Sequence, residues 1–251
     1  MKLGIIIQSR MGSSRLPNKM TLPFYKGKGI FEIILNRLKE AQLEIPIVLA
    51  TTDNKRDDCL EEIATKNNIK VFRGSENNVL ERFIKTAEEN NIQKIIRICA
   101  DNPFLDLNDL ERQINDFKQI KADYLSYCKK DKTPTILTSF GFWTEGVTLK
   151  ALEKAASVTE DTLYLEHVTN YIYKHPKEFI LKFKEIDPYF DQNSNIRLTV
   201  DTVSDFETAK EIYLNLKKTN SDFKAINIIE FVKTNLRWLK EMKKEIEENK
   251  K

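Results

Sequence analysis

Three cations lie close together in a short polar loop near the start of the chain: Arg10, Arg15 and Lys19. The loop follows the apolar run 3–7, which is typical of a strand buried on both faces. Backbone N–H groups in a loop of small residues can face an anion, and the three side chains can neutralise it. We therefore predict that the loop binds the phosphates of a nucleoside triphosphate, although a solvated turn is the simpler alternative.

The loop does not match the common phosphate-binding motifs. No Gly-Lys-Ser/Thr closes it, as a Walker motif requires, and the further glycines of a dinucleotide fingerprint are missing. Gly12 can adopt a positive φ, and Ser13 and Ser14 add little bulk. Asn18 tolerates a positive φ better than most residues, so the chain can also turn just before Lys19.

The order Arg-x-Gly-Ser-Ser-Arg-Leu-Pro-x-Lys from Arg10 to Lys19 closely resembles the nucleotide-binding loop of the cytidylyltransferases that make CMP-activated acidic sugars. It resembles in particular the branch called spore coat polysaccharide biosynthesis protein F, and the 3-deoxy-manno-octulosonate cytidylyltransferases are similar relatives. The resemblance implies transfer of CMP from CTP to a sugar or sugar-acid acceptor, with release of pyrophosphate, for surface glycan biosynthesis. The nucleotide-binding residues that it implies are Gln8, Ser9, Arg10, Met11, Gly12, Ser13, Arg15, Lys19, Thr52, Arg73, Ser75, Ala100 and Asp101.

Two aspartates, Asp101 and Asp201, each follow an apolar run. Either could simply form a turn or cap the helix that comes next. The family resembled here has an Asp-x-Pro at the first position and a Val-Asp-Thr-x-x-Asp stretch at the second, and both bind the metal. Mg²⁺ takes hard oxygen ligands, so we favour a metal site. The predicted catalytic set is Arg10, Lys19, Asp101 and Asp201.

The segment 122–195 is less regular, and we expect it to form a substrate-facing lobe that also supports dimerisation. Tyr164–Thr169 resembles the family's Arg-Glu-His-Val-Thr segment. We interpret His167 as a substrate contact, because a histidine on a helix is more often structural than catalytic. The stretch 142–145 departs from the more acidic segment of the relatives, which leaves the sugar unassigned. The predicted acceptor-binding residues are Trp143, Glu145, Glu166 and His167.

Strand and helix patterns alternate through the first half of the chain, which favours a parallel sheet with helices on both faces. Ligands of such sheets bind beyond the carboxyl ends of the strands. The resemblance implies the Rossmann-like three-layer α/β fold of nucleotide-diphospho-sugar transferases, as one domain over 1–251. We expect strands at 3–7, 47–50, 70–74, 94–99, 122–127 and 196–201, with the last strand leading into the second aspartate. We expect a single amphipathic helix over 226–251.

Composition excludes several other classes of protein. The 251 residues carry 41 basic and 38 acidic side chains, so the net charge of +3 gives no argument for a nucleic-acid partner. The three cysteines show no metal-binding spacing, and no apolar run is long enough to span a membrane. We therefore expect a cytoplasmic homodimer that binds CTP, Mg²⁺ and a small acceptor, without nucleic acid or membrane insertion.

Two other functions stay open from the sequence. A nucleotide-sugar-dependent glycosyltransferase would share this architecture, but such enzymes usually present a strand-end Asp-x-Asp, and Asp101-Asn102-Pro103 is not one. A non-catalytic nucleotide-binding protein would not need all three loop cations and both aspartates. Release of pyrophosphate from CTP would separate both alternatives from nucleotidyl transfer.

Overall fold

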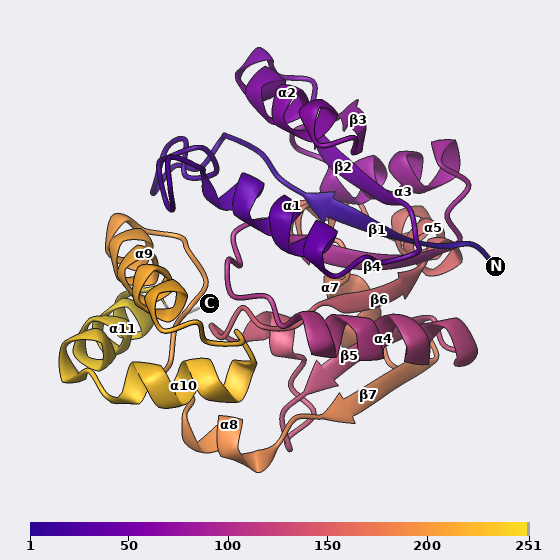
Figure 1. The fold of residues 1–251 in the computed structure, drawn as a ribbon. Helices are drawn as coiled ribbons and strands as arrows, with labels where there is room; N and C mark the ends of the chain where they lie inside the picture. Colours follow the sequence, from indigo (N-terminus) through magenta and orange to yellow (C-terminus); the bar gives the residue numbers. More distant parts are fainter. Residues whose placement is uncertain (250–251) are drawn as a thin grey trace.

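The computed structural model describes residues 1–249, whose strands form one seven-stranded sheet in the order β3-β2-β1-β4-β6-β5-β7 (Figure 1). Within the described strands, only β6 is antiparallel to its neighbours. The expected α/β fold with a mostly parallel sheet is confirmed. The strands are β1 (Leu3–Gln8), β2 (Ile47–Thr52), β3 (Lys70–Gly74), β4 (Lys94–Cys99), β5 (Tyr124–Cys128), β6 (Glu145–Thr148) and β7 (Leu181–Glu185).

Helices cover both faces of the sheet, as Figure 1 shows. The larger helices are α1 (Ile30–Glu40), α2 (Asp58–Lys66), α3 (Val79–Glu89), α4 (Leu107–Gln119), α5 (Leu149–Val158), α9 (Val203–Lys218), α10 (Ala225–Lys233) and α11 (Leu236–Glu248). The shorter ones are α6 (Thr162–Glu166), α7 (Asn170–Lys174), α8 (Pro188–Gln192) and the 3-10 turns η1 (Lys55–Asp57) and η2 (Thr135–Leu137).

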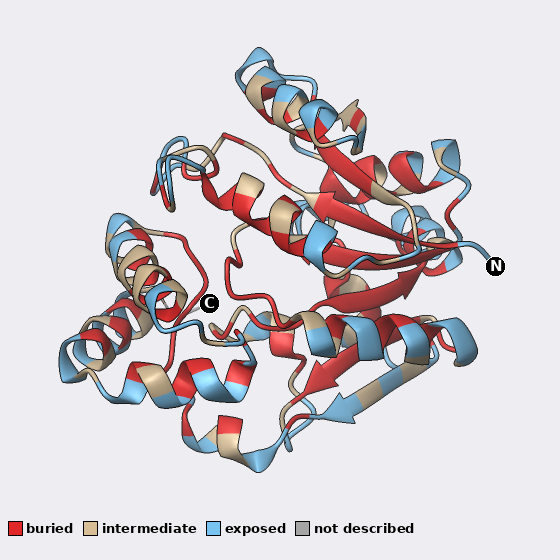
Figure 2. Cartoon of the chain, viewed as in Figure 1, coloured by how far each residue is buried: buried red, intermediate tan, exposed pale blue. Residues whose placement is uncertain are grey.

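The central strand β1 has a core on each side. Ile5 and Ile7 belong to an apolar cluster with α1, α4, α9 and α10, whereas Ile6 belongs to a second cluster with α3, α5 and α7. Successive side chains of a strand point to opposite faces, so an unbroken Ile run can fill both cores. The central strands β1, β4 and β6 are accordingly almost wholly buried, whereas the edge strand β7 is mostly intermediate or exposed (Figure 2).

The carboxyl ends of the parallel strands face the loop 9–29 and helix α9 (Figure 1). Helix α9 begins with a capping box, in which the Thr202 side chain accepts from the backbone of Asp205 and the Asp205 side chain accepts from the backbone of Thr202. Asp106 caps α4 and also accepts from the backbone N–H of Ala225 at 2.7 Å, so the start of α10 is tied to the start of α4. These contacts fix the start of α9 and join α10 to α4.

Two expected elements were wrong. Residues 196–200 do not form a strand: they are buried, but Leu198 bonds Ser139 and Val200 bonds the carbonyl of Asp101 instead of a neighbouring strand. The alternation of apolar and polar residues over 196–200 therefore reflects burial and not pairing with a neighbouring strand. The expected single helix over 226–251 is two helices, because Asn235 caps the start of α11. Leu236, placed in its apolar stripe, is 80% exposed. Residues 250–251 of that expected helix lie outside the described part.

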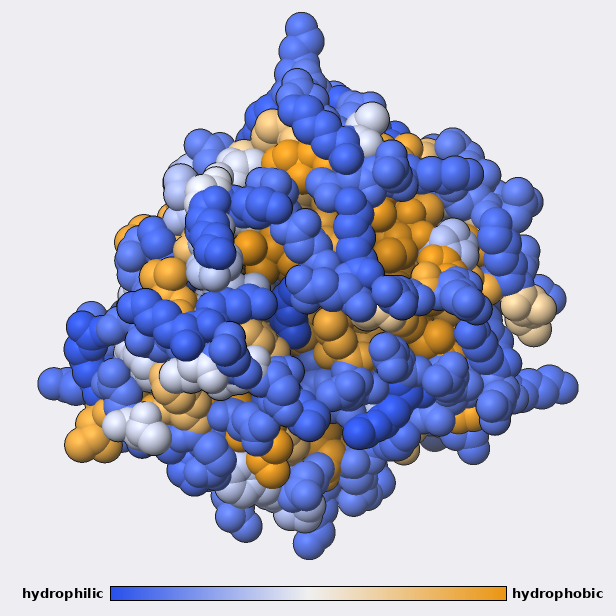
Figure 3. Space-filling model, in the orientation of Figure 1, coloured by the Kyte–Doolittle hydropathy of each residue, from blue (hydrophilic) through white to orange (hydrophobic). Residues whose placement is uncertain are grey.

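The segment 122–195 contributes β5, β6 and β7 to the same sheet. Its expected role as an acceptor-facing or dimerisation lobe stays a prediction. The face in Figure 3 is mainly hydrophilic, with apolar side chains visible between charged ones. Among the described residues, no helix is both long and apolar enough to cross a membrane.

Candidate functional site

The Lys19 ammonium lies between the two predicted metal ligands. Its Nζ is 3.2 Å from Asp101 Oδ2 and 3.4 Å from Asp201 Oδ1, and it donates to the carbonyl of Val200 at 2.7 Å. Burial alone would lower the pKa of Lys19, but the two carboxylates outweigh this effect and raise its pKa above the ordinary value. The structure therefore brings together three of the four predicted catalytic residues.

Asp201 is contacted by three cations, two from the loop 9–29 and one that lies four residues before it. Besides Lys19, Arg15 lies 3.3 Å from Oδ1 and Arg197 lies 3.3 Å from Oδ2. Arg197 is itself fixed by Asp205, with nitrogen–oxygen distances of 2.7 and 2.8 Å. Asp205 also accepts from the backbone N–H of Asp201. Together these contacts hold the Asp201 carboxylate in one place.

The loop keeps its shape through internal contacts. Asn18 has a φ of 60°, which confirms that this position requires the left-handed conformation that asparagine tolerates. Gly12 does not have a positive φ, contrary to the expectation. A Cβ at Gly12 would lie 2.5 Å from an Arg56 guanidinium nitrogen, so glycine instead allows a close approach. The N–H of Met11 donates to Asp57 Oδ1 at 2.8 Å, so this backbone donor faces a carboxylate of the protein itself.

Arg10 lies apart from the group that Lys19 forms with Asp101 and Asp201, here called the Lys19 group. Its guanidinium bonds Glu166 Oε1 at 3.1 Å and the carbonyl of Glu76 at 3.4 Å, so it links the loop to α6 and to the segment before α3. Glu166 and His167 are both exposed, at the end of α6. The predicted acceptor residues Glu166 and His167 are thus near the nucleotide loop, and their role stays a prediction.

Several predicted nucleotide-binding residues are already bonded to the protein. Thr52 donates to Asp57 at 2.6 Å, and Arg73 is 2.6 Å from both Asp58 and Glu61 on α2. Ser75 Oγ accepts from the backbone before α3. The Arg73 guanidinium is held by these two carboxylates of α2, so the proposed nucleotide site does not include it. Ser13 Oγ accepts from the loop backbone, Ser9 is buried, and Ala100 is buried next to β1.

Gln8, at the end of β1, has a defined orientation. Arg97 on β4 donates two hydrogen bonds to Gln8 Oε1, at 3.1 and 3.3 Å. Since a guanidinium can only donate, the oxygen of the amide must face Arg97 and the NH₂ group is left for another partner. Gln8 can therefore present a hydrogen-bond donor at the strand end.

Trp143 and Glu145 are buried and make contacts within the protein. The Trp143 ring packs 4.9 Å from Phe190, and its indole N–H donates to Asp109 at 2.8 Å. Glu145 is 1% exposed and pairs with Arg97 at 2.7 Å. Burial of both side chains argues against direct contact with a sugar, so the proposed acceptor site omits them.

The substitution Glu145→Gln separates a structural role of Glu145, as the partner of Arg97, from a role in binding the substrates. It removes the negative partner of a buried arginine, and breaking such a pair costs about 3–5 kcal/mol. We expect a loss of that order in the free energy of unfolding, measured by urea titration, with unchanged CTP affinity in the folded fraction. A stability close to that of the wild type would show that Glu145 is not the structural partner of Arg97.

The sequence interpretation missed Arg197, Asp205, Asp57 and Arg97. Arg197 and Arg97 each stand inside an apolar run, where a charged residue requires a partner. That pattern was a usable signal for a buried ion pair, but it does not identify the partner, which is Asp205 for Arg197 and the distant Glu145 for Arg97.

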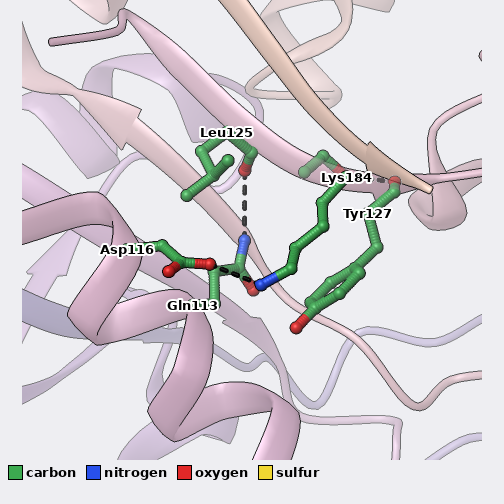
Figure 4. Close-up of a pocket in the computed structure, with 6 residues that line it drawn as sticks. Gln113, Asp116, Leu125, Tyr127 and Lys184 are labelled. Carbon is green, nitrogen blue, oxygen red and sulfur yellow. Dashed lines mark hydrogen bonds and ion pairs between the residues drawn. The ribbon is translucent and has the colours of Figure 1, made fainter. Parts of the chain in front are cut away.

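A small niche lies elsewhere in the fold, between α4, β5 and β7 (Figure 4). Lys184 closes it by pairing with Asp116 at 2.7 Å, and Gln113 donates to the carbonyl of Leu125 at 3.1 Å. The niche has no space large enough for a water molecule. The strand-end group around Lys19 therefore remains the candidate site.

Comparison with known families agrees with this geometry. Residues 4–230 match the family model described as cytidylyltransferase. The chain belongs to the cytidylyltransferase family. It is therefore a nucleotidyltransferase by family, and the matched range includes every residue of the Lys19 group.

Individual relatives cover nearly the same range. An uncharacterized protein of Methanocaldococcus jannaschii is 35% identical over 235 residues, which are 94% of this chain and 92% of that protein. The spore coat polysaccharide biosynthesis protein SpsF of Bacillus subtilis is 34% identical over 213 residues, covering 83% and 85%. A solved structure of a cytidylyltransferase from Leptospira borgpetersenii is 33% identical, with a TM-score of 0.82 over 95% of this chain and 97% of that one.

Proposed function

We propose that this cytidylyltransferase-family protein transfers CMP from CTP to a hydroxyl of a sugar or sugar-acid acceptor, releasing pyrophosphate. The observation that carries the proposal is the convergence of Arg15 and Lys19 on Asp101 and Asp201 at the strand ends. The name of the Bacillus subtilis relative supports a precursor of a surface polysaccharide as the product. The protein would act as a homodimer in the cytoplasm.

The cations would bind the triphosphate by exchanging partners. Arg15 is nearly half exposed, so its guanidinium can leave Asp201 for a phosphate oxygen. Arg10 can leave Glu166 in the same way, because both side chains of that pair are accessible. The new bonds to phosphate are charge-assisted, as are the ion pairs that they replace, so each cation keeps a strong partner in the exchange.

The two aspartates fit a Mg²⁺ site that is completed by the substrate. The described residues contain no group of three or more His, Cys, Asp or Glu side chains able to hold a metal. Asp101 and Asp201 nevertheless converge on one point, the position of Lys19 Nζ. Mg²⁺ commonly binds through one or two carboxylates together with substrate phosphates, and when bound it neutralises charge on phosphate oxygens.

The reaction requires positioning and charge neutralisation more than covalent catalysis. The acceptor hydroxyl would attack the α-phosphorus and lose its proton to solvent, the bond between the α-phosphorus and the bridging oxygen of the β-phosphate would break, and pyrophosphate would leave. Lys19 and Arg15 would hold the phosphates in line and neutralise the charge that develops on the leaving group. Asp205 acts through Arg197, which keeps the Asp201 carboxylate oriented.

Nucleotide preference tests the proposal. We expect Mg²⁺ with CTP to raise the melting temperature more than Mg²⁺ with ATP, GTP or UTP. A ligand at a hundred times its Kd stabilises the folded state by about 2.7 kcal/mol, which a thermal-shift assay detects easily. Stronger stabilisation by a purine nucleotide would contradict the proposal. Pyrophosphate release that needs both CTP and an acceptor, screened over sugar acids and phosphorylated sugars, would distinguish it from glycosyl transfer.

A further inference from the structure

Arg82, near the start of α3, is a fully buried cation with unused hydrogen-bond donors. Its Nη1 donates to the carbonyl of Ser75, whereas Nε and Nη2 have no hydrogen-bond partner. Leaving buried donors unsatisfied costs about 1–3 kcal/mol for each group, and more for charged groups. The chain therefore keeps an arrangement that is unfavourable unless something else binds there.

Neighbouring charged groups do not satisfy the unused hydrogen-bond donors of Arg82. Burial lowers the pKa of Arg82 to about 10, and the positive charge of Arg10 adds to the effect. Asp57 and Asp53 act in the opposite direction, but neither bonds Arg82, and the two oxygens of Asp57 already accept from Met11, Thr51 and Thr52. Nε and Nη2 of Arg82 therefore stay open to hydrogen-bond acceptors of a ligand.

Arg82 lies on the β3 side of the site, away from Lys19 and Asp101 at the end of β4. Its partner Ser75 follows β3, whereas Asp101 follows β4, and β2 and β1 stand between these two strands. Neighbouring strands are about 4.8 Å apart, so three steps separate the two ends by roughly 14 Å. A nucleotide whose phosphates contact Lys19 can extend its base toward Arg82.

The free edge of the guanidinium has a specific hydrogen-bonding pattern. Nε–H and Nη2–H point in parallel from one edge and match two adjacent acceptors. Cytosine presents such a pair in O2 and N3, whereas N3 of uracil carries a hydrogen and would oppose a donor. We propose that Arg82 reads the base of the nucleotide by donating to O2 and N3 of cytosine, so that CTP is selected over UTP. This inference rests on the proposed function.

Access to Arg82 depends on a movable neighbour. Arg10 is held by Glu166, whose side chain is 53% exposed, and by a single 3.4 Å bond to the Glu76 carbonyl. A shift of Arg10 toward the phosphates, as proposed above, removes its charge from the surroundings of Arg82. Binding of the triphosphate and reading of the base would then occur together.

Calorimetry with CTP, UTP and inorganic tripolyphosphate tests the assignment on the wild type, Arg82→Lys and Arg82→Gln. We expect the wild type to bind CTP at least tenfold more tightly than UTP. In both variants, CTP affinity should fall at least tenfold, UTP affinity should change less than threefold, and tripolyphosphate affinity should not change. Arg37→Lys is the matched control, because Arg37 is also buried and donates through Nη1 to a backbone carbonyl, that of Pro103.

Each other result overturns the assignment. Equal losses for CTP and UTP would make Arg82 a structural residue, and a loss for tripolyphosphate would make it a phosphate contact. If neither variant folds, the wild type with 3-deazacytidine triphosphate, which lacks the N3 acceptor, gives the answer. We expect at least tenfold weaker binding than for CTP, and equal affinity would refute the inference. A wild type that binds no nucleotide would instead refute the proposed function.

Discussion

Asp101→Asn and Asp201→Asn are each expected to abolish most of the release of pyrophosphate from CTP while the chain stays folded. Both carboxylates converge on one point, and each would contribute to the same Mg²⁺ site. Residues that act as a unit are not additive, so the double variant should be little worse than either single one. Turnover at saturating Mg²⁺, measured beside the melting temperature, tests this expectation.

The competing explanation is that each aspartate only stabilises its local backbone. That role predicts a loss of about 1 kcal/mol in stability with nearly normal turnover. Asp187→Asn provides the matched control, because Asp187 caps the distant helix α8 by accepting from the N–H of Tyr189. Turnover close to that of the wild type in either single variant would remove that aspartate from the site.

Lys19→Ala is expected to weaken CTP binding about tenfold or more, because a charge-assisted hydrogen bond to phosphate is worth roughly 1.5–3 kcal/mol. Lys19 is 9% exposed and separates two carboxylates, so we also expect a lower melting temperature. Arg15 and Arg197 limit the loss at Asp201.

The pH dependence of that stability difference follows from the pKa of Lys19. The folded-state pKa is raised above 10.5, so the charge of Lys19 stabilises the fold fully below that value. The stability difference between the wild type and Lys19→Ala should therefore shrink as the pH rises through the folded-state pKa. Lys66→Ala, at an exposed helical lysine, is the control. Unchanged CTP affinity in a folded Lys19→Ala protein would exclude Lys19 from the phosphate site.

The sequence predicted the first four strands well because each is a short run with apolar residues that ends in a polar segment. β3, for example, has the expected bounds of Lys70–Gly74. Parallel pairing then places their carboxyl ends together, so Lys19 and Asp101 could be predicted as neighbours from topology. The resemblance supplied Asp201, whose local structure was expected to be a strand and is instead a buried segment without strand pairing.

The missing parts depend on contacts between distant segments. Glu145 was expected to face an acceptor, but Arg97 on the neighbouring strand binds it, and no local pattern reveals that pairing. Arg73 was placed near the nucleoside because of the Phe-Arg-Gly-Ser stretch, yet two carboxylates of α2 hold it. Arg82 was not considered at all, since an arginine in a helix usually faces solvent.

The position of β1 has a consequence for synthesis on the ribosome. This strand is made before the other strands of the sheet, yet it lies inside the sheet, with Leu3 paired to Lys94 of β4. At about 5–20 residues per second, roughly 5–20 s pass before Lys94, 91 positions after Leu3, is made. During that time one edge of an Ile-rich strand stays unpaired. A nascent chain paused before β4 should therefore be a strong client for a chaperone that binds apolar segments, and one paused after β4 a weak client.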